Sequence, residues 1–96
     1  MHIARPPDGF IVRQSKAVEA LIKASCEQWP RLDAHWLAIQ QRLKFTGHRE
    51  GLLIGPHRPG WKLFVDDGDP PAGLPRIRVV YRILGDTLSI DMASIG

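Results

Sequence analysis

The 96-residue sequence contains one cysteine, Cys26, which excludes an internal disulfide and a cysteine-based zinc cluster. A single thiol without disulfides is typical of a reducing compartment, so we expect a cytoplasmic domain. Long apolar runs are also lacking, because no stretch approaches the roughly 18 apolar residues of a membrane span. Residues 1–9 hold two prolines and an aspartate without an apolar segment, so we expect neither a signal peptide nor a membrane partner.

Metal and cofactor signatures are equally scarce. The four histidines are scattered, and no two of them lie four residues apart on one helix face. Glycines recur at Gly47, Gly51 and Gly55, but the Lys-Ser/Thr ending of a phosphate-binding loop is absent. We therefore expect no metal ion and no small-molecule cofactor.

What remains is an ordinary composition for a folded protein, with 44% hydrophobic and 24% charged residues. No linker or internal repeat divides the chain, so we expect a single domain over residues 1–96 with an irregular lead at residues 1–9.

The net charge of +3 is unevenly distributed. Residues 42–62 carry five Lys/Arg and a single acid, Glu50. A second group, Arg76, Arg78 and Arg82, contains no acid. Such clusters permit an anionic partner, and they are equally compatible with a solvated basic surface.

Two amphipathic helices are predicted after a short edge strand at residues 10–13. Ser15 is the expected N-cap of the first helix, whose apolar spacing continues to Trp29. Pro30 is expected to end that helix and to lie in the first turn of the second, whose apolar residues recur through Leu43. Together they predict an antiparallel helical hairpin.

The second half of the chain predicts an antiparallel meander of three strands. An apolar run at residues 61–65 is followed by a polar loop at residues 66–75 and a strand at residues 76–84 with period-two alternation. Gly85-Asp86 predicts a two-residue hairpin turn leading into a last strand at residues 87–94. The expected fold is therefore a two-layer α+β sandwich: an N-terminal strand, a helical hairpin and a three-stranded meander.

The turn also predicts cross-strand partners. Leu84 should face Thr87, and the following pairs are Ile83–Leu88, Arg82–Ser89, Tyr81–Ile90, Val80–Asp91, Val79–Met92 and Arg78–Ala93. In this register Met92 points to the core. Asp91 is then a diagonal neighbour of the two arginines of the outer face.

The residues Arg78-Val79-Val80-Tyr81-Arg82-Ile83, the Gly85-Asp86 turn and the closing residues 88–96 resemble the RelE/ParE superfamily of toxins from bacterial toxin–antitoxin pairs. Residues 10–12, leading into Ser15-Lys16-Ala17, and Trp61-Lys62-Leu63 fit the same pattern. The resemblance implies a RelE/ParE-like fold and a cognate antitoxin as partner. It also implies either metal-free cleavage of mRNA on the ribosome or contact inhibition of DNA gyrase.

For RNA cleavage, the resemblance assigns Arg78 to the phosphate clamp and Lys62 to a basic catalytic position. Independently of the family, His57 has the chemistry of a general acid or base near neutral pH. The residues expected to contact nucleic acid are Arg58, Arg76, Arg82 and Trp61. Family members usually carry a second basic residue where this chain has Phe64. They also often continue past the closing glycine, where this sequence ends at Gly96, so we expect an incomplete catalytic set.

Structural alternatives stand beside each of these assignments. Arg78 and Arg82 can pair with Asp91, Lys62 can be a solvated strand residue, and His57 can be a plain loop histidine. Tyr81 is expected in the core with a partner for its hydroxyl. At the level of function, the alternatives to a ribosome-dependent nuclease are a gyrase-inhibiting toxin without chemistry and an inactive antitoxin-binding module.

Overall fold

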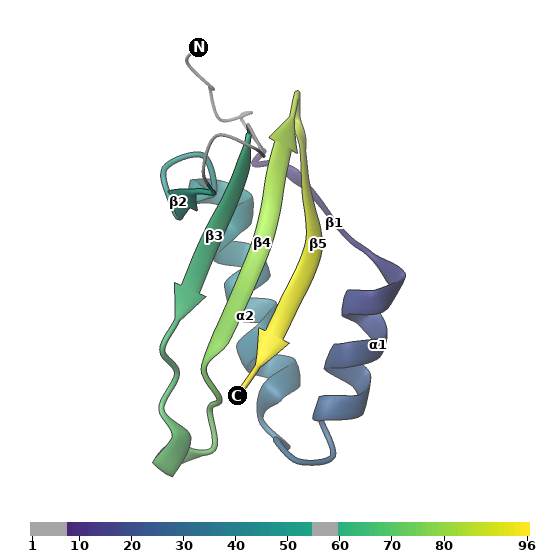
Figure 1. Ribbon diagram of the computed structural model, residues 1–96, viewed down its shortest axis with the longest axis vertical. Coiled ribbons are helices and arrows are strands. Elements are labelled where there is room, and N and C mark those ends of the chain that lie inside the picture. Colours follow the sequence, from purple (N-terminus) through teal and green to yellow (C-terminus); the bar gives the residue numbers. More distant parts are fainter. Residues whose placement is uncertain (1–7, 55–59) are drawn as a thin grey trace.

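A computed structural model describes residues 8–54 and 60–96 (Figure 1). The elements in chain order are β1 (Ile11–Gln14), α1 (Lys16–Ser25), α2 (Leu32–Thr46), β2 (Leu52–Leu53), β3 (Trp61–Asp66), the 3-10 turn η1 (Pro70–Ala72), β4 (Ile77–Leu84) and β5 (Thr87–Ile95).

The strands form one mixed sheet of five strands in the order β1-β5-β4-β3-β2. Strand β1 runs parallel to β5, and every other neighbouring pair is antiparallel. The expected α+β class is confirmed. The sheet is larger than a three-stranded meander, because β1 and β2 add to its two edges (Figure 1).

Helix α1 begins as predicted and ends earlier. The Ser15 side chain accepts a hydrogen bond from the Val18 backbone N–H at 3.1 Å, which satisfies one free donor of the first turn. The helix stops at Ser25, so the expectation that it continues to Trp29 is wrong. The backbone N–H of Trp29 instead bonds the Ser25 carbonyl at 2.9 Å and closes a turn, from which the indole packs against the core.

Helix α2 begins at Leu32, two residues beyond Pro30, which lies in the preceding turn and not in the helix. Its buried residues are the predicted ones: Leu32, Trp36, Ile39 and Leu43. The Trp36 indole N–H donates to the Gln14 side-chain oxygen at 3.0 Å, which connects the helix to β1. A buried indole therefore keeps its polar atom satisfied.

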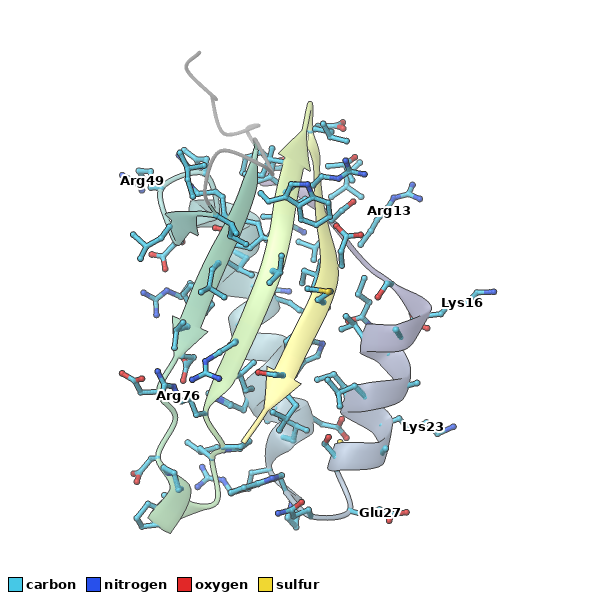
Figure 2. All side chains as sticks on the ribbon, in the orientation of Figure 1. Arg13, Lys16, Lys23, Glu27, Arg49 and Arg76 are labelled. Atoms are coloured by element: carbon cyan, nitrogen blue, oxygen red, sulfur yellow. The ribbon has the colours of Figure 1, made fainter. Side chains whose placement is uncertain are left out.

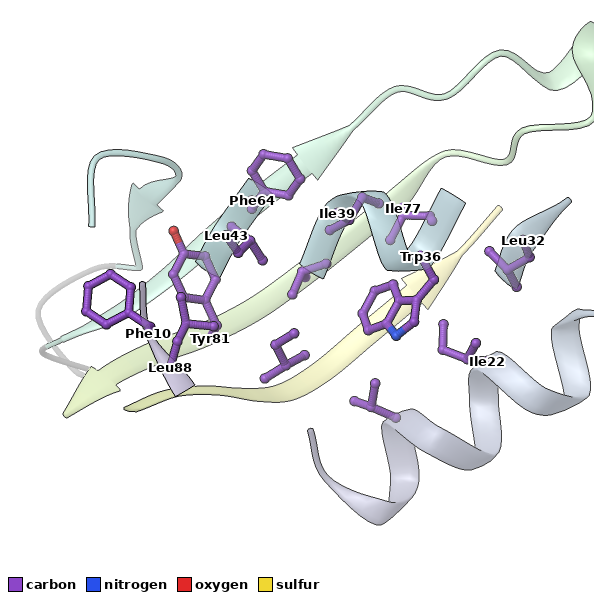
Figure 3. Packing of buried hydrophobic residues seen from close by; sticks show 13 residues of the cluster. Phe10, Ile22, Leu32, Trp36, Ile39, Leu43, Phe64, Ile77, Tyr81 and Leu88 are labelled. Atoms are coloured by element: carbon purple, nitrogen blue, oxygen red, sulfur yellow. The ribbon is translucent and has the colours of Figure 1, made fainter. Parts of the chain in front are cut away.

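The core lies between the helices and one face of the sheet (Figure 3). It contains Phe10, Val18, Ile22, the four α2 residues, and Phe64, Ile77, Val79, Tyr81, Leu88 and Ile90 from the strands. The inward residues of β4 alternate with outward ones as the period-two pattern predicted. Both helices thus cover a single face, and no helix of residues 8–54 and 60–96 covers the other face of the sheet.

The β4–β5 hairpin follows the predicted register only over its first half. Gly85 has φ of 62°, as a turn with glycine in the first position requires. The four pairs from Leu84–Thr87 to Tyr81–Ile90 are the predicted ones. Beyond them a β-bulge intervenes, and Val80 pairs with Met92.

The bulge corrects the three remaining pairs. Asp91 is the extra residue, so Val79 pairs with Ala93 and Arg78 with Ser94. Met92 lies on the face opposite the core and is 52% exposed. The prediction that it points to the core is therefore wrong. Ala93 packs against the core in its place.

Deleting Asp91 is expected to preserve the fold, because removing the extra residue leaves every other β5 side chain on its present face. We expect a loss of about 1–2 kcal/mol of unfolding free energy in urea denaturation, typical of a local change that leaves the core intact.

Deleting Ser89 is the matched control. That deletion places Asp91 opposite Tyr81 in the core and turns Ile90 outward, so we expect the cooperative transition to disappear. Equal stabilities of the two deletion variants would contradict the bulge.

Candidate binding site on the open face of the sheet

The face of the sheet that lacks helices, here called the open face, presents an aligned set of apolar side chains. Register pairs Leu52 with Leu63, Leu63 with Val80, and Val80 with Met92. Directly paired residues project to the same side, so these four form a continuous row across β2, β3, β4 and β5. We call Leu52, Leu63, Val80 and Met92 the apolar row.

Arginines lie on both sides of the apolar row. Along β4, Arg78 lies two residues before Val80 and is exposed. Arg82 lies two residues after Val80. Residues two apart on a strand share a face, so both guanidinium groups belong to the open face. The Arg82 guanidinium carbon lies 5.0 Å from the centroid of the Trp61 ring, a cation–π distance.

A shallow groove of about 290 Å³ occupies part of this face. Its lining residues are Leu63, Arg78, Val80, Met92, Ala93 and Ser94. It combines one guanidinium group with thioether and aliphatic surface. Such a surface can bind an apolar side chain and a nearby anion at the same time.

The alternative in which Asp91 neutralises these arginines is not what the structure contains. Neither Arg78 nor Arg82 forms an ion pair with Asp91 within residues 8–54 and 60–96. Arg76, which immediately precedes β4 and is labelled in Figure 2, instead lies 3.6 Å from the Asp67 carboxylate (Nε to Oδ1). Within the part of the chain that the structure describes, neither Arg78 nor Arg82 therefore has a carboxylate partner, and Arg82 is half-buried against Trp61.

Lys62 lies on the opposite face. It pairs with Tyr81, whose ring is buried among the core residues, and its ammonium donates to the His48 carbonyl at 3.1 Å. Partial burial lowers the pKa of the Lys62 ammonium below its ordinary value, and the nearby Glu50 carboxylate opposes that shift. Lys62 is therefore neither a fully solvated strand residue nor a neighbour of Arg78.

Tyr81 holds the α2–β2 connection against the sheet. Its hydroxyl oxygen lies 2.8 Å from the Gly47 carbonyl oxygen and 2.9 Å from the Glu50 carbonyl oxygen. The single hydroxyl proton can be donated to either carbonyl or shared between them. Burial raises the pKa of this hydroxyl, and the charge of Glu50 raises it further. The expected core position of Tyr81 with a hydroxyl partner is confirmed.

The structure thus places three of the predicted site residues, Arg78, Arg82 and Trp61, on one face of the sheet, and Lys62 on the other. Arg82 contacts Trp61, whereas Arg78 lies on the far side of the apolar row. Arg76 lies at the end of the same face, while His57 and Arg58 lie outside the described residues. The sequence analysis missed the apolar row. Period-two spacing does place Leu63 and Val80 on outward positions, but the alignment of Met92 with them depends on the bulge.

A second pocket, of about 280 Å³, meets the open face at Leu52, Leu63 and Val65 and also includes Arg42 and Glu50. A pocket of about 440 Å³ between the start of β1 and α2 includes Phe10, Leu37 and Lys44 and none of the predicted site residues. Within residues 8–54 and 60–96 no three His, Cys, Asp or Glu side chains are grouped to hold a metal ion. Neither α1 nor α2 has the length and apolar content needed to cross a bilayer.

Comparisons of the chain with protein-family models, with curated proteins and with solved structures found no match.

Replacing Tyr81 by Phe is expected to cost about 1–2 kcal/mol at neutral pH, because a buried donor to two carbonyls is lost. The raised pKa adds a pH dependence. Tyr81 keeps its proton in the folded state, while the unfolded chain ionises above about pH 10, so wild-type stability should fall as pH rises beyond that value.

Urea denaturation of both proteins at pH 7 and pH 11 measures this effect. The stability gap between wild type and Tyr81→Phe should narrow at pH 11, since Tyr81 is the only tyrosine in the sequence. Ser94→Ala, a change at an exposed β5 position, serves as control. A gap that is constant with pH would contradict the role of burial.

For Lys62, NMR titration of the labelled lysine side chains should give a pKa below the ordinary value of about 10.4. Glu50→Gln removes the opposing charge and should lower the Lys62 pKa further, whereas the remote Glu27→Gln should not change it. A Lys62 pKa at or above the ordinary value would contradict the partial burial of its ammonium.

Proposed function

We propose that this chain is a toxin-like component of a RelE/ParE-type toxin–antitoxin pair that acts by binding another protein and not by cutting RNA. The observation that carries the proposal is the separation of Arg78 and Lys62 onto opposite faces of the sheet. The resemblance in residues 78–96 supports the family. The open face supports the mode of action.

Metal-free RNA cleavage requires a base, an acid and a cation around one phosphate. Arg78 faces solvent on the open face, whereas the Lys62 ammonium is engaged with the His48 carbonyl on the other side of the sheet. The sheet therefore lies between the two cations. Phe64 occupies the position where the family has a second basic residue, and its buried ring belongs to the core.

A binding toxin needs no catalytic set, and its target must supply a complementary surface. The apolar row flanked by arginines provides such a surface, and none of the described helices covers it. By resemblance to the ParE branch, the target is DNA gyrase, and a cognate antitoxin is the second partner. The same proposal includes a RelE/ParE-like arrangement of the helices and strands.

RNA cleavage is the second candidate, because Arg78, Arg82 and Trp61 do share the open face. In that case Arg78 binds the phosphate, Trp61 contacts a base, and the acid–base group comes from His57. This candidate depends on His57, whereas the first depends on described residues alone.

The two candidates give different results when the chain alone is induced in a bacterial host and protein and DNA synthesis are followed by pulse labelling. The binding toxin should reduce DNA synthesis first and inhibit purified gyrase in a supercoiling assay. Lys62→Met should retain this effect, and Arg78→Ala should weaken it at least tenfold.

Loss of protein synthesis within minutes, with ribosome-dependent mRNA cleavage abolished in His57→Ala, would establish the nuclease instead. Folded protein that changes neither synthesis rate would contradict a toxin activity and leave the inactive antitoxin-binding module. Circular dichroism of each variant separates loss of function from loss of fold.

A further inference from the structure

The shape of the apolar row restricts what can cover it. Its four residues occupy four adjacent strands, and neighbouring strands lie about 4.8 Å apart, so the row is about 14 Å long and runs across the strands. Leu52 at one end is 75% exposed and Met92 at the other is 52% exposed. Large apolar side chains aligned on an open surface are typical of interaction sites.

Positive charge flanks both long sides of this row. Arg78 and Arg82 are each about 6.8 Å from the row along the strand direction, at two residues of about 3.4 Å. Arg13 pairs with Ser89, which pairs with Arg82, so a second guanidinium extends that flank (Figure 2). Along the strand direction, the apolar row therefore has Arg78, between Val65 and Ser94, on one side. On its other side it has Arg82 and Arg13, with Ser89 between them.

We infer that the open face binds an acidic amphipathic helix of a partner protein, with the helix axis along the apolar row. The apolar stripe of such a helix lies between two lines of flanking side chains, and acidic residues on both flanks would meet the arginines. About ten helical residues span 14 Å at 1.5 Å per residue. An extended strand presents one line of side chains per face, so it cannot place carboxylates on both sides of an apolar line.

Single-stranded RNA fits this surface less well. Base stacking needs open aromatic faces, and Trp61, the aromatic residue of the open face within the described strands, already has the Arg82 guanidinium over its ring. The row itself is aliphatic and thioether surface. The polarisable, unbranched Met92 can adapt to different apolar side chains of a helix.

The experiment uses the whole chain and a synthetic 14-residue helical peptide with a leucine stripe flanked by glutamates. Two control peptides carry lysines in place of the glutamates or the same residues in scrambled order. NMR titration should shift the methyl signals of Leu63, Val80 and Met92 with the acidic peptide. The scrambled and lysine peptides should bind at least tenfold more weakly, and raising the salt concentration should weaken binding of the acidic peptide.

Charge reversal tests the flanks. The Arg78→Glu/Arg82→Glu variant should lose at least tenfold affinity for the acidic peptide and gain affinity for the lysine peptide. Lys23→Glu, at an exposed position on α1, is the matched control and should bind as wild type does. Met92→Glu should weaken binding of the acidic peptide, and it should leave the fold unchanged because Met92 is exposed.

Equal binding of the acidic and scrambled peptides, or methyl shifts confined to another surface, would overturn the inference. Tighter binding of a 12-nucleotide single-stranded RNA than of the peptide, with the same methyl groups shifted, would identify a nucleic-acid face and overturn it as well. The inference rests on the proposed function in assigning this face to a protein partner. Peptide binding without an effect on growth would contradict the toxin activity and retain the helix-binding face.

Discussion

The extra residue in β5 determines which side chains the open face presents. Up to Ile90, β5 follows the register imposed by the Gly85-Asp86 turn, and the bulge at Asp91 then advances the strand by one residue. Met92 consequently lies beside Val80 and completes the apolar row, while Ala93 turns to the core. The Asp91 carbonyl also accepts a hydrogen bond from the Ser15 hydroxyl at 3.2 Å, so the bulge contacts the N-cap residue of α1.

The two faces of the sheet carry separate tasks as a result. The covered face holds the core and, through Tyr81 and Lys62, the segment that leaves α2. Both side chains donate hydrogen bonds to backbone carbonyls, so replacing Tyr81 or Lys62 affects the fold. The open face contributes little to the core, so its arginines and its apolar row can change with much less cost to stability.

Local patterns predict the parts of this fold that depend on local interactions. The buried face of α2, the Ser15 cap and the first four pairs of the hairpin follow from spacing and turn chemistry. The bulge leaves no such signal, since Asp91 is neither a glycine nor part of a turn. The face of Lys62 depends on the register between β3 and β4, and the long loop that joins them does not fix that register as a two-residue turn does.

The pairing of β1 with β5 joins residues 11–14 to residues 87–90, near opposite ends of the described chain. Contacts between residues so distant in sequence require the closure of a large loop, which is entropically costly and slow. Helix α2 and the β4–β5 hairpin can form from neighbouring residues, whereas β1 must wait until β5 exists. During synthesis, the N-terminal strand therefore leaves the ribosome long before its partner does and takes its place in the sheet among the last steps of folding.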